Sequence, residues 1–136
     1  MKRLVVAVVL SLAAITVIGA VALASARGDF GPVPARQTVP APIDQIQVLI
    51  RESAPPQVTV QVRAGLPGGC AQRESHSVRR SGDTFTVTVL NSMPSGDAVC
   101  TMIYGTYELS VDLGGPFTSG ATYTVHVNDR TTTFKT

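Results

Sequence analysis

The sequence predicts an all-β domain, an antiparallel β-sandwich of about seven strands, preceded by an N-terminal apolar helix. Three observations support this prediction. Apolar and polar residues alternate in five segments after residue 42, which is the period of strands with one buried face. Clusters of Gly, Pro, Asn, Asp and Ser separate these segments, as is typical of turns. No segment after residue 26 has the helical spacing of apolar residues, so two sheets packed face to face are expected.

Residues 1–26 have the composition of a signal peptide or a membrane anchor. Lys2 and Arg3 precede the uncharged run Leu4–Ala24, and Ala24-Ser25-Ala26 has the small residues of a cleavage site. The run is longer than the apolar core of most signal peptides and close to the roughly 20 residues that span a bilayer as a helix. Cleavage and anchoring both stay open. Either way, the preceding positive charges predict that the rest of the chain is exported, either secreted or held outside by one helix.

The charge distribution excludes electrostatic binding to nucleic acid. The whole chain has a formal net charge of +2. Because Lys2 and Arg3 belong to the N-terminal segment, the remainder carries as many acidic as basic residues. A neutral domain lacks the basic surface that binds phosphate backbones. We expect a protein partner at the cell surface, and membrane contact through residues 4–24 if that run is not cleaved.

Residues 27–42 are expected to form a Pro-rich tether, because they hold four prolines and no apolar period. Residues 43–136 are expected to form the β-sandwich. Its strands are predicted from the alternation of apolar residues with Gln, Thr, Ser and charged residues. The alternation is weaker in three of these strands, Ser75–Arg80, Val99–Tyr104 and Thr131–Thr136. In chain order the predicted strands are Ile46–Ile50, Val58–Val62, Ser75–Arg80, Phe85–Val89, Val99–Tyr104, Tyr107–Leu113, Tyr123–Val127 and Thr131–Thr136.

The same alternation predicts the core and the turns. His126, Glu108 and Asp112 fall at the polar positions and are expected to face solvent. The predicted core residues occupy the apolar positions, namely Val58, Val60, Val62, Phe85, Val87, Val89, Leu109, Val111, Tyr123, Val125 and Val127. The predicted turns are Pro55-Pro56, Gly65–Gly69, Ser81-Gly82-Asp83, Pro94–Asp97, Gly114–Pro116 and Ser119-Gly120.

Cys70 and Cys100 are the only cysteines, and they predict one disulfide. An exported chain meets an oxidising compartment, and an even count leaves no spare thiol. Zinc binding would require His76 and His126 as further ligands, but neither cysteines nor histidines show the paired spacing of zinc sites. Neither cysteine follows the apolar run directly, so lipidation there is excluded.

The segment Leu113–Val127 resembles the corner between strands E and F of immunoglobulin-like and fibronectin type III folds. It combines a Gly-rich stretch with Tyr123 at the start of a strand. The resemblance implies that the Tyr123 hydroxyl bonds to the backbone just upstream. The chain departs from antibody domains because it has no Trp and no Cys in the strand of Tyr123.

Residues 43–129 are similar to uncharacterised exported bacterial proteins and lipoproteins. The similarity rests on Glu52–Gln57, on Gly65-Leu66-Pro67 with Cys70, on Cys100-Thr101 with Tyr104-Gly105, and on Phe117, Gly120, Tyr123-Thr124-Val125 and Val127-Asn128. It implies export, the disulfide and the sandwich, and it brings no activity. The chain lacks the lipidated cysteine of the lipoprotein members.

Catalytic and metal sites are not expected. A Ser nucleophile needs a base, and only His76, in a polar edge-like segment, and His126, on a polar strand face, could serve. No Gly-x-Ser-x-Gly motif occurs. Glu108 and Asp112 stand roughly 13 Å apart on one strand, too far for a glycosidase pair.

The sequence favours a non-catalytic, exported interaction module without catalytic, cofactor or metal residues. Asp97 and Asp129 lack the acidic neighbours of a calcium loop. A proteinase inhibitor that presents Gly65–Gly69 or Pro94–Ala98 is the alternative. A small hydrolase or carbohydrate-binding domain is disfavoured by the lack of a base, a metal set and tryptophan.

Overall fold

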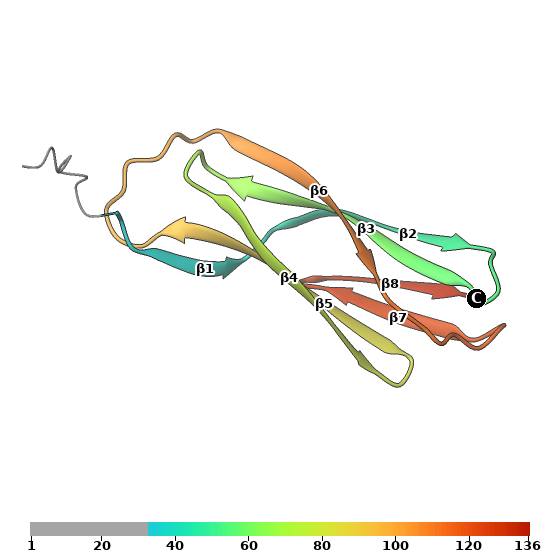
Figure 1. Ribbon diagram of the computed structural model, residues 1–136. Coiled ribbons are helices and arrows are strands. Elements are labelled where there is room, and N and C mark those ends of the chain that lie inside the picture. The colour runs from blue at the N-terminus through green and yellow to red at the C-terminus, as the bar shows by residue number, and fades with distance from the viewer. Residues whose placement is uncertain (1–32) are drawn as a thin grey trace, which may run out of the picture. The chain divides into compact units, whose positions relative to one another are not determined.

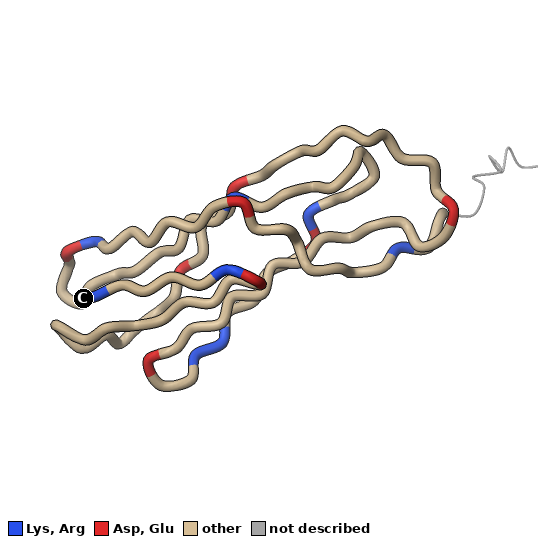
Figure 2. Tube along the Cα trace, turned by 180° about the vertical axis from the view of Figure 1, so that it is seen from behind, with Lys and Arg blue, Asp and Glu red and all other residues tan. Residues whose placement is uncertain are grey.

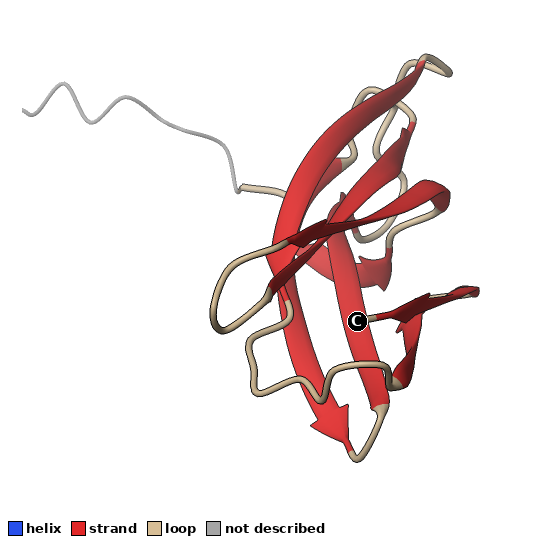
Figure 3. Cartoon of the chain, turned by 90° about the vertical axis from the view of Figure 1, so that its right-hand side faces the viewer, coloured by secondary structure: helices blue, strands red, loops and turns tan. Residues whose placement is uncertain are grey.

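The computed structural model describes residues 33–136, and the predicted export or anchor helix lies outside them. The described part consists of strands and loops, which stack in two layers (Figures 1 and 3). No helix long and apolar enough to cross a membrane occurs among residues 33–136. The eight strands are β1 (Arg36–Pro40), β2 (Ile43–Arg51), β3 (Gln57–Pro67), β4 (Gln72–Ser81), β5 (Thr84–Pro94), β6 (Tyr104–Asp112), β7 (Thr122–Val127) and β8 (Arg130–Lys135).

The strands form two sheets, which confirms the predicted all-β sandwich. One sheet has the order β2-β3-β6. The other has the order β1-β5-β7-β8, with β4 on the second side of β5. The prediction of a wholly antiparallel sandwich is wrong in one place, because Thr84–Val87 of β5 pairs in parallel with Thr124–Val127 of β7. The chain crosses between the sheets after β6 and therefore returns beside β5 in the same direction.

All predicted core residues are buried between the sheets. Side chains on alternate positions of β3, β5, β6 and β7 meet there, as the period of two requires. Glu108 and Asp112 are exposed as expected. The core also includes Leu113 and Phe134, which the alternation placed on inward positions, and Ala41, Ile43 and Ala64, which it did not identify. By contrast, Ile50 is exposed near the end of the edge strand β2.

The predicted tether extends too far, because its last residues belong to the domain. Residues Pro34–Thr136 form one compact unit, and β1 lies within the expected tether. β1 pairs with the end of β5, and the next residue, Ala41, is buried. The Asn128 side chain holds this crossover, since its amide nitrogen donates to the carbonyls of Ala41 and Val89 at 2.8 Å each.

One predicted strand and one predicted turn are also wrong. The predicted strand Val99–Tyr104 is a loop, and β6 begins only at Tyr104. The predicted turn Gly65–Gly69 is strand up to Pro67, because β3 pairs with β6 along this stretch. The Tyr104 ring lies directly over Gly65, where any Cβ would clash with it.

Asn91 is a buried polar side chain that links the two sheets. Its amide nitrogen donates to the Gly65 carbonyl at 2.8 Å, and its amide oxygen accepts from the Tyr107 hydroxyl at 2.8 Å. Both partners lie in the opposite sheet. The bonds satisfy the amide inside the core, where an unpaired polar group would be costly.

The segment before β7 contains the predicted corner. The Tyr123 hydroxyl accepts a hydrogen bond from the Thr118 N–H at 2.7 Å. The ring of Phe117 stands edge-on to that of Tyr123, with centroids 5.3 Å apart. Arg80 from β4 lies over the same aromatic cluster and donates to the Pro116 carbonyl at 2.8 Å. Gly120 has a φ of 77°, a conformation that favours glycine.

The Tyr123→Phe variant is expected to lower the free energy of unfolding by about 0.5–1.5 kcal/mol, the usual net value of one hydrogen bond. The Thr118 N–H then loses its partner while the aromatic packing stays. Thermal melting measures the change. Tyr104→Phe is the comparison, because it removes an exposed hydrogen bond to Asp44 and should cost less than loss of the part-buried bond of Tyr123. Equal melting temperatures of the Tyr123→Phe variant and the wild type would refute the role of this bond.

Candidate functional site

The two histidines do not come together in the structure. His126 lies on the face of β7 opposite to the core, half-buried, with Nδ1 2.8 Å from the Thr131 hydroxyl of β8. His76 is exposed on β4. The contact of His126 with a neighbouring threonine has the geometry of a cross-strand structural pair.

The predicted outward carboxylates have structural partners. Glu108 accepts from Arg63 at 2.7 Å in an exposed ion pair across β3 and β6. Asp112 accepts from the Gly114 N–H at 2.9 Å and so shapes the turn after β6. Among residues 33–136, no group of three or more His, Cys, Asp or Glu residues is placed to hold a metal ion.

Cys70 and Cys100 form the predicted disulfide, with an S–S distance of 2.12 Å and a Cα–Cα distance of 5.5 Å. The bond joins the turn between β3 and β4 to the loop between β5 and β6. We call these two segments, Pro67–Ala71 and Ala98–Tyr104, the tip. Figure 1 shows both at the end of the domain where the described chain begins.

The tip is braced by several contacts besides the disulfide. The Gly69 N–H donates to the Thr101 carbonyl at 2.9 Å, and Gly69 packs so closely on Thr101 that a Cβ would clash. Arg36 donates to the Cys70 carbonyl at 2.9 Å. Tyr104 donates to Asp44 at 2.8 Å, and this bond to a carboxylate raises the pKa of the Tyr104 phenol. These contacts fix the shape of the tip.

Large apolar side chains of the tip point into solvent. Val99 is 99% exposed, Met102 97% and Ile103 71%. No charged residue occurs between Asp97 and Glu108, and Figure 2 shows this loop as an uncoloured stretch. Single exposed apolar residues are common, but a cluster of them marks an interaction surface. The only sequence signal for this surface is the weak alternation of apolar and polar residues over Val99–Tyr104, which predicts a strand.

A second unusual surface is β4, whose side chains are exposed over all ten residues. The register places His76 opposite Val89, Val78 opposite Val87 and Arg80 opposite Phe85. Directly opposed residues share a face of the sheet, so these three side chains lie on the core side of β4. Their exposure shows that the opposite sheet does not cover this strand.

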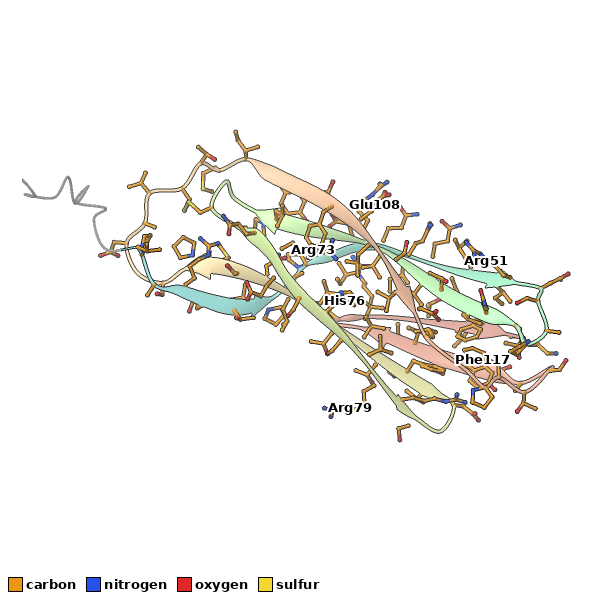
Figure 4. All side chains as sticks on the ribbon, in the orientation of Figure 1. Arg51, Arg73, His76, Arg79, Glu108 and Phe117 are labelled. Carbon is orange, nitrogen blue, oxygen red and sulfur yellow. A yellow bond between two sulfur atoms is a disulfide. The ribbon has the colours of Figure 1, made fainter. Side chains whose placement is uncertain are left out.

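The β4 surface is basic, so the prediction that a neutral domain lacks a basic surface is wrong for this strand. It carries Arg73, Arg79 and Arg80 against a single acid, Glu74; Figure 4 labels Arg73, His76 and Arg79 along the strand. None of these arginines has a carboxylate partner among the described residues. Arg80 packs on the aromatic cluster and donates to the Pro116 carbonyl, whereas Arg79 makes no such contact within residues 33–136. Arg73 lies 5.8 Å from the centroid of the Tyr107 ring, and burial raises the pKa of that phenol against the opposing effect of Arg73.

β4 also has a free edge. Within residues 33–136 it pairs with β5 alone, so alternate backbone N–H and C=O groups face outward. Such an edge can accept a further strand.

Comparisons with known proteins give a family but no activity. Residues 60–136, more than half of the chain, match the family of the ORF11 beta-sandwich domain. An uncharacterized 10.2 kDa protein in the HgiCIIM 5′ region of Herpetosiphon aurantiacus is 29% identical over 87 residues, which are 64% of this chain and 90% of that protein. No solved structure matches the chain.

Proposed function

We propose that this chain, which belongs to the ORF11 beta-sandwich domain family, is a non-catalytic interaction module that works outside the cytoplasm. In this proposal it binds an acidic protein segment along β4. The observation that carries the proposal is the β4 surface, a ten-residue edge strand with exposed side chains and arginines that lack carboxylate partners. A partner strand would supply backbone hydrogen bonds to the free edge and carboxylates to the arginines.

The location outside the cytoplasm is supported by two independent features. The disulfide is typical of oxidising compartments. Lys2 and Arg3 followed by an uncharged run are typical of export signals and anchors. Together they make the cell surface the proposed place of action.

An immunoglobulin-like relationship is proposed for the corner segment alone. The bond between Tyr123 and Thr118 supports it. The parallel pairing of β5 with β7 argues against extending it to the whole sandwich.

A proteinase inhibitor is the second candidate, and the braced loop favours it. Inhibitors present a rigid exposed segment, and Val99, Met102 and Ile103 lie on such a segment. The predicted presenting segment Pro94–Ala98 leads directly into it. A tip that binds a protease cannot at the same time be buried in a membrane. The vesicle experiment below therefore distinguishes protease inhibition from membrane insertion.

Binding along β4 is tested with a synthetic ten-residue peptide that repeats Glu-Glu-Thr-Thr. Arg73 lies opposite the buried Asn91 and Arg79 opposite the exposed Thr86, so carboxylates are needed on both faces of an added strand. Titrated by fluorescence anisotropy against the full chain in nonionic detergent, this peptide is expected to bind, and a Lys-for-Glu peptide to bind at least about tenfold more weakly. The Arg73→Glu, Arg79→Glu double variant should lose about tenfold in affinity for the acidic peptide. Arg51→Glu, on exposed β2 of the other sheet, is the matched control and should leave the affinity unchanged.

A second peptide separates strand addition from simple charge attraction. Methylation of alternate amide nitrogens of the acidic peptide removes the hydrogen bonds that an added strand needs. Loss of binding by this peptide supports strand addition. Equal binding of the methylated and unmethylated peptides, or of the acidic and basic ones, contradicts the proposal.

A further inference from the structure

We propose that the tip embeds in the interface of a lipid bilayer, with Val99, Met102 and Ile103 entering the boundary between headgroups and acyl chains. This inference rests on the extracytoplasmic location proposed above, but not on partner binding by β4. The tip thus contacts a lipid surface. Binding of a protein partner or a protease to the same loop is the competing outcome.

The composition of the tip suits an interface. Val99, Met102 and Ile103 are apolar and largely exposed, and Tyr104 beside them is about half exposed with its hydroxyl bonded to Asp44. Apolar side chains flanked by an amphipathic aromatic residue are the usual pattern of membrane interfaces. The disulfide and the contact of Gly69 with Thr101 hold the loop in place. Insertion into the bilayer therefore costs the loop little conformational entropy.

The path of the chain indicates a membrane in preference to a soluble partner. The Ser95 N–H and hydroxyl both donate to the Ala35 carbonyl at 2.7 Å, and Arg36 pairs with Pro94. The chain therefore enters the domain directly beside the loop that carries the apolar residues. The uncharged run Leu4–Ala24 precedes this entry point in the sequence, so an anchor formed by it would connect to the domain at its tip end.

The charges around the tip specify the kind of bilayer contact. The loop between Asp97 and Glu108 carries no charge, and the charged residues that bond to or flank the tip, Arg36, Asp44 and Asp97, include both signs. Attraction to anionic headgroups is therefore not the driving force. Binding is expected in neutral phosphatidylcholine and should change little with salt concentration.

The test uses the absence of tryptophan from the chain, because one introduced indole is then the only such reporter. The full chain carrying Met102→Trp is reconstituted in phosphatidylcholine vesicles with brominated acyl chains. The indole is expected to show blue-shifted emission and at least about twofold quenching by the bromine, because it lies at acyl depth. The control Ser81→Trp, in the hairpin at the opposite end of β4 and β5, should show neither change.

A second substitution tests whether the apolar loop itself carries the contact. Adding Ile103→Asp to the Met102→Trp chain should remove the quenching, because a charge opposes entry into the acyl boundary. Both sites are exposed, so thermal melting should confirm an intact fold. Absence of quenching at residue 102, equal quenching at residues 81 and 102, or shielding of residue 102 only by an added protein or protease overturns the inference. The peptide titrations contain no vesicles, so their failure is a separate result.

Discussion

Replacing Cys70 and Cys100 together by serine is expected to lower the free energy of unfolding by about 3–4 kcal/mol. The bond closes a loop with a sequence separation of 30 residues, and its removal restores that freedom to the unfolded chain. For a domain of this size the melting temperature should fall by roughly 15 °C or more. Thermal melting followed by circular dichroism measures the difference.

Reduction of the wild-type disulfide is the matched control for this double variant. Dithiothreitol should produce a similar fall in melting temperature in the wild type and none in the serine variant, because the variant has no bond to reduce. Replacing both cysteines at once avoids a free thiol. A loss below about 1 kcal/mol would show that the unfolded chain gains little freedom and that the other contacts of the tip suffice.

The Phe85→Ala variant is expected to lose about 3–5 kcal/mol of stability, the usual cost of truncating a buried phenylalanine. Phe85 is fully buried, its ring centroid lies 5.8 Å from that of Phe117 and 6.1 Å from that of Tyr123, and Arg80 covers it at 5.0 Å. Its removal leaves a cavity that these rings cannot fill without moving. Urea unfolding measures the loss.

Two further variants keep this prediction testable if the alanine variant does not fold. Phe85→Leu retains most of the volume and should cost about 1 kcal/mol. Val78→Ala, on the neighbouring but partly exposed strand β4, is the control and should cost less than the alanine variant at Phe85. Equal losses for Val78→Ala and Phe85→Ala would contradict the assignment of Phe85 to the centre of the core.

Local physical chemistry made much of the fold predictable from the sequence. A period of two places Val58, Val87 and Val125 on one face of their strands whatever the order of those strands in the sheets, and each is buried. The disulfide could be predicted from the number of cysteines and the predicted compartment alone. The resemblance of Leu113–Val127 to an immunoglobulin-like corner implied the bond of the Tyr123 hydroxyl to the backbone upstream.

Most of the candidate site could not be predicted in this way. Alternation in β4 is nearly absent, because both faces of the strand are exposed, and only the register with β5 shows which side chains face the core side. The tip depends on contacts between segments far apart in sequence, such as Gly69 with Thr101 and Arg36 with Cys70. The composition of Val99–Tyr104 alone predicts a strand, because it contains no information about those contacts.

Side-chain chemistry and local spacing were thus enough to show which residues prefer burial, where most of the turns lie and that the two cysteines should pair. The tertiary structure decided that β1 belongs to the domain, that β5 and β7 run in parallel, and that Asn91 joins the sheets. It also decided that apolar residues of the tip lie outside the core. These outcomes depend on long-range pairing, whose free energy is shared among distant segments and leaves no local pattern in the chain.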